Sequence, residues 1–247
     1  MPLAPINHVD AFRAEAERCA ELARSIPHAA PLPHVPRWSV GGVVRHLVGD
    51  FRWAAEIIEA RDWSGNGFTV PRTRGDALVQ SYGEAASRMG DALAVAAAEP
   101  TVPCPNFAER DHGTLGWWPR HQAHETLLHR WDLESATGLH HAIDPAVAAD
   151  GVDEAFQVYT QRYGSQRLDR PITLVCTDAD AAWSITPTGL GGHVDVARTD
   201  DRDHPDLACS AEALLLAIWK RVPVTADTAF LSDEATVRRF LSGPLTA

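Results

Sequence analysis

The 247-residue sequence predicts a mainly α-helical fold with an α+β C-terminal part. Through about the first 165 residues, apolar positions recur with the 3.6-residue period of helices. After Gly164, short segments rich in β-branched residues alternate with turn signals, a pattern typical of strands. The length suits one large domain or two small ones with a buried core. We therefore expect a helical bundle over residues 1–165, followed by a smaller α+β domain over residues 166–247.

Capping residues delimit the expected elements. Ser39 is a plausible N-cap, Gly138 can end a helix in the left-handed conformation, and Asp144 followed by Pro145 suits a helix start. The predicted helices span residues 9–26, 40–61, 76–99, 118–137 and 145–163. In the second domain, strands are expected to begin at Ile172, Ala181 and His193, and helices to span residues 211–222 and 233–241.

Composition excludes several classes of function. The chain has 22 basic and 33 acidic residues, a net charge of -11, so it lacks the basic surface that nucleic-acid binding requires. Its four cysteines are far apart, without a CxxC pair, which argues against a disulfide framework or a zinc knuckle. With no secretion signal and only short apolar runs, we expect a cytoplasmic protein without a membrane partner.

The fourth predicted helix carries the sequence HQAHETLLHRWDLE and a candidate half-site for a metal. His124 and Glu125 suggest the HExxH motif of metalloproteases, but the next histidine is His129. Five residues turn a helix about 140° beyond one full turn, so His124 and His129 cannot share an ion. Glu125 and His129 are four residues apart and share one face. A carboxylate and an imidazole so placed suit zinc or a similar divalent ion.

His46 is the candidate third ligand, because it lies among apolar residues on the inward face of the second helix. Two histidines and a glutamate from two bundle helices would leave a coordination position open, as in catalytic sites. Asp50, four residues after His46, could hold the other nitrogen of that imidazole. Asp132 could orient His129 in the same way.

These residue patterns also have structural interpretations. A single histidine on an apolar helix face is more often a hydrogen-bonded core residue, and a Glu–His pair four residues apart often only stabilises its helix. His121 could be an alternative ligand or a residue at the rim, and His124 a core residue or a residue that supports a ligand. Arg130 and Asp132 are first of all expected to form an ion pair on the bundle surface, with the orienting role of Asp132 as the alternative.

The segments RWSVGGVVRHLVGDFRWAA, RHQAHETLLHRWDLESATG and HAIDPAVAADGVDEAF resemble the mycothiol-dependent maleylpyruvate isomerase family, within the DinB-like metal-binding superfamily. The segment ACSAEALLLAIWKRVPVTAD resembles the second domain of that family. The resemblance implies a DinB-like four-helix bundle followed by a small sterol-carrier-like α+β domain. It also implies a divalent metal, typically zinc, held by a histidine and a Glu-x-x-x-His pair, which match His46, Glu125 and His129.

The resemblance further implies that the cosubstrate is mycothiol, a low-molecular-weight thiol that a metal can ionise. The residues that bind mycothiol cannot be identified from the sequence. Arg221 matches an arginine commonly found in the family and could clamp an anionic substrate, although a surface ion pair is the alternative. Lys220 departs from the family, which usually has glycine there.

Three functions remain open at this point. The first is metal- and mycothiol-dependent cis–trans isomerisation of maleylpyruvate or a related unsaturated diacid. The second is a mycothiol S-transferase that acts in detoxification or natural-product biosynthesis. The third is a non-enzymatic module that binds an apolar ligand and has a structural metal. The first two require a small-molecule electrophile and a thiol as partners, and the oligomeric state is not predicted.

Overall fold

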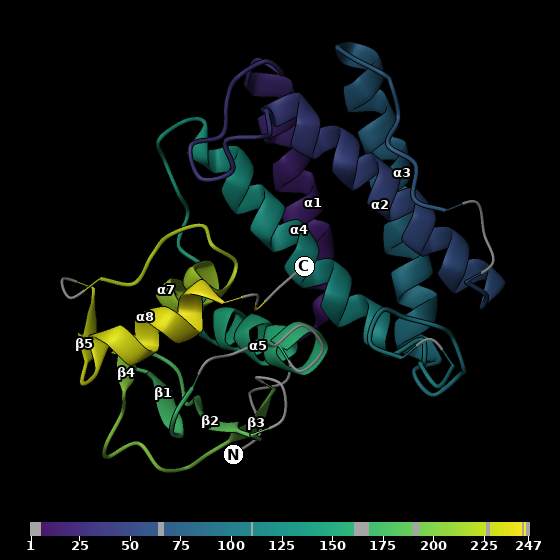
Figure 1. The fold of residues 1–247 in the computed structure, drawn as a ribbon. Helices are drawn as coiled ribbons and strands as arrows, with labels where there is room; N and C mark the ends of the chain where they lie inside the picture. Colours follow the sequence, from purple (N-terminus) through teal and green to yellow (C-terminus); the bar gives the residue numbers. More distant parts are fainter. Residues whose placement is uncertain are drawn as a thin grey trace. The chain divides into compact units, whose positions relative to one another are not determined.

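The protein is described by a computed structural model that covers residues 6–63, 67–109, 111–160, 168–189, 193–225, 228–243 and 245. The chain divides into two compact units, a bundle unit of residues 6–141 and a C-terminal unit of residues 142–247 (Figure 1). This division lies earlier than the predicted boundary near residue 165. The reason is that helix α5 (Pro145–Ala155) packs against helix α7 (Ala211–Ile218) of the C-terminal unit.

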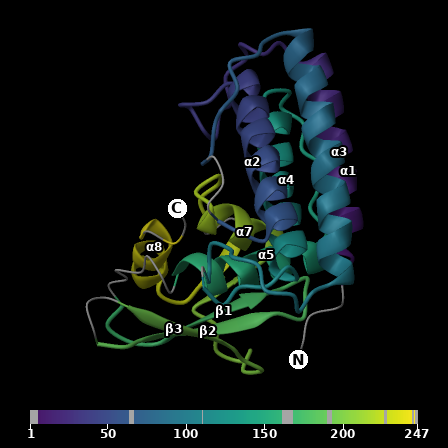
Figure 2. The ribbon, with the colours of Figure 1, turned by 90° about the vertical axis from the view of Figure 1, so that its right-hand side faces the viewer.

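The bundle unit consists of four long helices that run side by side (Figure 2). Ser39 caps the second helix as predicted, because its side chain accepts a hydrogen bond from the Gly42 amide. The apolar faces of the helices form one core, in which Phe12, Leu47 and Tyr82 are fully buried. The helices are α1 (His8–Ser25), α2 (Val40–Ala60), α3 (Asp76–Ala98) and α4 (Trp117–Ser135).

The C-terminal unit contains a five-stranded sheet of order β3-β2-β1-β4-β5, with helices α5, α7 and α8 on one face (Figure 2). Only the β1–β4 pair is parallel, and the other neighbours are antiparallel. Phe156 packs against both Trp183 of the sheet and Phe240 of α8, which links the two layers. The strands are β1 (Ile172–Cys176), β2 (Ala182–Pro187), β3 (Val194–Arg198), β4 (Leu207–Cys209) and β5 (Ala229–Leu231), and the last helix is α8 (Glu234–Ser242).

The mainly α fold with an α+β C-terminal part is confirmed. Most predicted helix ends agree with the structure to within two residues, but the helix after Ser210 ends at Ile218, four residues early. The fifth helix changes to a π-helix over Phe156–Thr160, and its predicted last residues, 161–163, lie outside the described ranges. None of the helices in the described ranges combines the length and the hydrophobicity that crossing a bilayer requires.

Candidate metal centre

The structure brings His46 of α2 together with Glu125 and His129 of α4. The Nε2 atoms of His46 and His129 lie 3.0 Å and 3.1 Å from the same Glu125 oxygen, Oε1. The three candidate ligand atoms all lie within 4.8 Å of one another. Glu125 and His129 share a helix face because they are one turn apart, and His46 approaches them from α2. Two imidazole nitrogens and a carboxylate oxygen form the donor set of a borderline divalent ion such as Zn²⁺.

The three side chains are mostly buried, which strengthens their mutual electrostatic interactions. Burial opposes ionisation of Glu125, but the two imidazoles outweigh it and hold the pKa of this carboxyl well below its usual range. Burial also opposes protonation of His129, yet the Glu125 charge and the Asp132 hydrogen bond raise its pKa to about 9. Without a metal, therefore, the cluster retains a proton at His129, the position that a divalent cation would replace.

Asp132 accepts a hydrogen bond from His129, with 3.0 Å between Nδ1 and Oδ2, and is fully buried. This bond leaves Nε2 of His129 directed to the candidate ligand cluster. The prediction of a surface pair between Asp132 and Arg130 is wrong. Arg130 is itself buried, and its guanidinium pairs with Glu15 and Glu134 at 2.8 Å and 2.7 Å.

Asp50 does not form the predicted hydrogen bond with His46. Its Oδ2 atom is buried without a hydrogen-bond partner in the described structure. Burial, followed by the charge of Glu125, raises the pKa of Asp50 to about 6, and His46 offsets part of this effect. Asp50 lies near the cluster because it is four residues from His46. Its side chain, however, is on the buried side of α2, so the carboxylate lies in the core.

The charges of the described residues fit a divalent ion. Glu125 and Asp132 bring two negative charges to a buried site, and neutral imidazoles bring none. Because isolated buried charge is costly, a site of this composition requires compensating positive charge. A cation of charge +2 held by His46, Glu125 and His129 would provide it. The residues present therefore fit the metal that the sequence resemblance implies.

The other histidines of α4 lie outside this cluster. His121 is buried and stacks on Trp117 with 4.3 Å between ring centroids, so it is neither an alternative ligand nor a rim residue. His124 is a buried residue, as predicted, and its ring lies 5.9 Å from that of His8.

Two aromatic residues next to the ligands were not predicted from the sequence. The Trp38 ring lies 5.0 Å from the His46 ring and 5.9 Å from the His129 ring. The Phe68 ring lies 5.4 Å from the His46 ring. Both belong to loops, for which helical periodicity carries no information. The sequence signal for the Phe68 loop was Gly49, because a glycine inside a helix often marks a place where another backbone segment comes close.

None of the four cysteines is suited to act as the reactive thiol. All are buried and without a disulfide partner. Burial raises the pKa of every one of these thiols, to about 12 for Cys176 and Cys209. A thiolate is the nucleophilic form, so these side chains are inert near neutral pH. Any thiol chemistry at this site requires a thiol from outside the chain.

Arg221 lies in the C-terminal unit, just after α7, whereas the three candidate ligands lie in the bundle unit. Its guanidinium donates a hydrogen bond of 2.9 Å to the carbonyl of Trp219 and lies 6.0 Å from the Trp219 ring. Lys220 adopts a φ of 60°, in the left-handed region that favours glycine. This conformation explains why glycine is common at the position, and here Lys220 donates a hydrogen bond to the Leu241 carbonyl.

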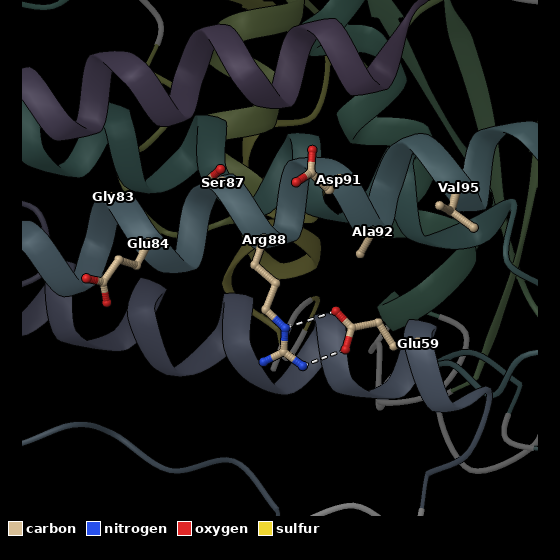
Figure 3. Close-up of a pocket in the computed structure, with 8 residues that line it drawn as sticks. All are labelled: Glu59, Gly83, Glu84, Ser87, Arg88, Asp91, Ala92 and Val95. Carbon is tan, nitrogen blue, oxygen red and sulfur yellow. Dashed lines mark hydrogen bonds and ion pairs between the residues drawn. The ribbon is translucent and has the colours of Figure 1, made fainter.

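A surface groove in the bundle unit is lined by Glu59 of α2 and by residues of α3 (Figure 3). Its only basic side chain, Arg88, forms a two-pronged ion pair with Glu59, with nitrogen–oxygen distances of 2.9 Å and 2.6 Å. The lining residues include no cysteine or histidine. The groove therefore offers neither a thiol nor an imidazole, unlike the His46–Glu125–His129 cluster.

Comparisons with known proteins agree with the resemblance seen in the sequence. Residues 12–134 match the family described as the mycothiol maleylpyruvate isomerase N-terminal domain. No curated protein matches the chain significantly. Two crystal structures, of the mycothiol-dependent maleylpyruvate isomerase and of a histidine-to-alanine mutant, each align with a TM-score of 0.60 at 12% identity, covering 91% of both chains. Through the bundle of residues 12–134, the chain belongs to the mycothiol maleylpyruvate isomerase N-terminal domain family.

Proposed function

We propose that this protein is a metal-dependent enzyme that uses mycothiol, a low-molecular-weight thiol, to attack a small electrophilic substrate. The observation that carries the proposal is the convergence of His46, Glu125 and His129 in one partly buried cluster. Membership of the family supports the choice of mycothiol as the thiol. The high pKa of the chain's own cysteines supports an external thiol. Reduced cysteines and a diffusible thiol suit a cytoplasmic location.

In this proposal, the residues of the chain hold and orient the reacting groups. His46, Glu125 and His129 hold the divalent ion, and Asp132 fixes the His129 ring by accepting its Nδ1 proton in a hydrogen bond. Such an ion is a Lewis acid that favours the ionised form of a thiol. For a diacid substrate, Arg221 is proposed to bind one of the carboxylates. The buried cysteines take no part.

The reaction to test first is cis–trans isomerisation of maleylpyruvate or a related unsaturated diacid. The name of the family and the names of the two similar crystal structures support this choice. Isomerisation returns the thiol unchanged, whereas an S-transferase leaves it on the product. Incubation with mycothiol and a panel of electrophiles, followed by mass spectrometry and NMR, therefore distinguishes the two. No thiol-dependent turnover, together with a bound lipid in the purified protein, would support the non-enzymatic alternative.

The metal site has its own test. The purified protein should contain about one Zn²⁺-type ion per chain, measured by elemental analysis. The single changes His46→Ala, Glu125→Ala and His129→Ala should each abolish retention of the ion. His121→Ala, on the same helix but outside the cluster, should retain it. If all three cluster variants keep full metal content, the assignment is wrong.

A further inference from the structure

Two exposed aromatic rings lie against the imidazoles of the candidate metal centre. Trp38 is 37% exposed and contacts the rings of His46 and His129. Phe68 is 44% exposed and contacts the His46 ring. The side chains of His46 and Glu125 are themselves 23% and 18% exposed, so the centre is accessible beside these rings. The exposed parts of His46 therefore lie beside Trp38 and Phe68.

The backbone around both rings holds them at this position. Trp38 directly precedes Ser39, the N-cap of α2. The Val40 amide, two residues after Trp38, donates a hydrogen bond to the Ala30 carbonyl and so holds this part of the loop in place. The segment that carries Phe68 crosses α2 at Gly49. A Cβ atom on Gly49 would lie 2.9 Å from the Thr69 carbonyl oxygen, closer than such atoms can approach. Glycine is unfavourable inside a helix, and here it permits the close crossing.

The chemistry of these rings favours one class of substrate. Exposed aromatic side chains gain free energy when a flat apolar group covers them. The faces of aromatic rings carry partial negative charge, which disfavours contact with carboxylates. The net charge of -11 on the chain also repels a dianion from a distance. A small diacid would lose these favourable contacts, whereas an uncharged aryl or alkyl group would make them.

We propose that Trp38 and Phe68 determine specificity by binding the flat, apolar body of the electrophile, so that the preferred substrate is an uncharged unsaturated carbonyl compound with an aromatic substituent. This inference rests on the proposed function and narrows it. The thiol adds to the activated double bond of such a compound, and its proton goes to the neighbouring carbon. Elimination with the reverse proton transfer yields the isomer, and retention of the thiol yields the conjugate, so neither outcome requires an oxidant.

The test compares two electrophiles that share a conjugated cis double bond, a cis-configured phenyl enone and maleylpyruvate. The zinc-loaded full chain is assayed with mycothiol as wild type and as Trp38→Ala and Phe68→Ala. Each change should lower kcat/KM for the phenyl enone about tenfold, which corresponds to one lost aromatic contact, and should alter the maleylpyruvate value less than twofold. Val95→Ala is the control, because Val95 is 51% exposed but lies at the end of α3 among the residues of the surface groove.

A binding measurement without turnover completes the test. Calorimetric affinity for the saturated phenyl ketone, which cannot react with a thiol, should fall about as much as kcat/KM in both variants, while metal content stays constant. Gly49→Ala, which must displace the Thr69 backbone, should reproduce the Phe68→Ala loss. Equal losses for both electrophiles, or a change confined to the KM for mycothiol, would overturn the inference. If the wild type turns over neither electrophile, the proposed function fails, and ketone binding alone then decides the role of the rings.

Discussion

Helix α4 contributes to two charged clusters that differ in how their charge is balanced. The metal cluster combines two carboxylates with imidazoles, whereas the structural cluster combines two carboxylates with two guanidinium groups. Every charged group of the structural cluster has an ion-pair partner within 3.2 Å. The metal cluster consists of Glu125, His129 and Asp132 with His46 of α2, and the structural cluster of Arg130 and Glu134 with Glu15, Arg18 and the loop residue His141.

The difference indicates which of the two ionic clusters is suited to bind a metal. Arginine stays protonated throughout the physiological range, so Arg18 and Arg130 neutralise Glu15 and Glu134 permanently. Histidine gains or loses its proton near neutral pH, so the metal cluster can exchange a proton for a cation. A balanced cluster stabilises the bundle and needs no ligand. A cluster with surplus negative charge on donor atoms that converge on one point is suited to bind a metal.

The largest expected effect on stability comes from Glu134→Gln. This change leaves the Arg130 guanidinium buried with less compensating charge, and breaking such a pair costs about 3–5 kcal/mol. The matched change Glu125→Gln should cost the metal-free protein less, because His129 can release its proton and become neutral. Urea unfolding with a chelator present measures both. If both changes lower the free energy of unfolding equally, the charges of Glu134 and Glu125 are equivalent, and the comparison of the two clusters is wrong.

Glu134 should also make the stability of the folded protein sensitive to acid. Burial opposes its ionisation, but the His141 amide and Arg130 outweigh this and lower the pKa of Glu134. A carboxyl with a lowered folded pKa contributes stability above its unfolded pKa of about 4.5, and this contribution is lost as the pH falls through the folded value. Glu134→Gln should therefore flatten the loss of stability below about pH 4.5.

A smaller effect is expected for Asp132→Asn, measured as metal affinity. Asp132 contacts no metal in this proposal, but it orients the His129 ring through Nδ1. Loss of such a partner weakens metal binding about 10–100-fold. Competition with a zinc chelator gives the value. Glu15→Gln, which alters the structural cluster, should leave the metal affinity within about twofold, and a large effect there would show that the two clusters are coupled.

Local signals in the sequence predicted much of this arrangement. The spacing of Glu125 and His129 was sufficient for a shared face, and Ser39 marked the start of α2. Strands β4 and β5 were not predicted, because three residues are too few to show alternation. The contact of Phe68 with His46 depends on a loop that crosses a helix at Gly49, a tertiary feature without periodicity. The same limit applied to Arg130, whose partner Glu15 is 115 positions away.

The pH dependence of zinc binding tests the exchange of proton for metal directly, without any change of sequence. The metal-free pKa of His129 is raised to about 9, because the Glu125 charge and the Asp132 hydrogen bond outweigh burial. Zinc needs the neutral imidazole, so binding below pH 9 should release one proton and the affinity should rise about tenfold per pH unit. The stability of the metal-free protein should show the opposite trend and fall as the pH rises. A histidine with a raised folded pKa contributes stability that is complete below its unfolded pKa of about 6.5 and is lost as the pH rises toward 9. Arg130 and Glu134 do not titrate in this window, because their pKa values are raised and lowered away from it. Calorimetric titration of zinc at pH 6.5 and 8.5 in buffers of different ionisation enthalpy counts the released protons. An affinity that is constant between these pH values would mean that no proton occupies the position of the metal.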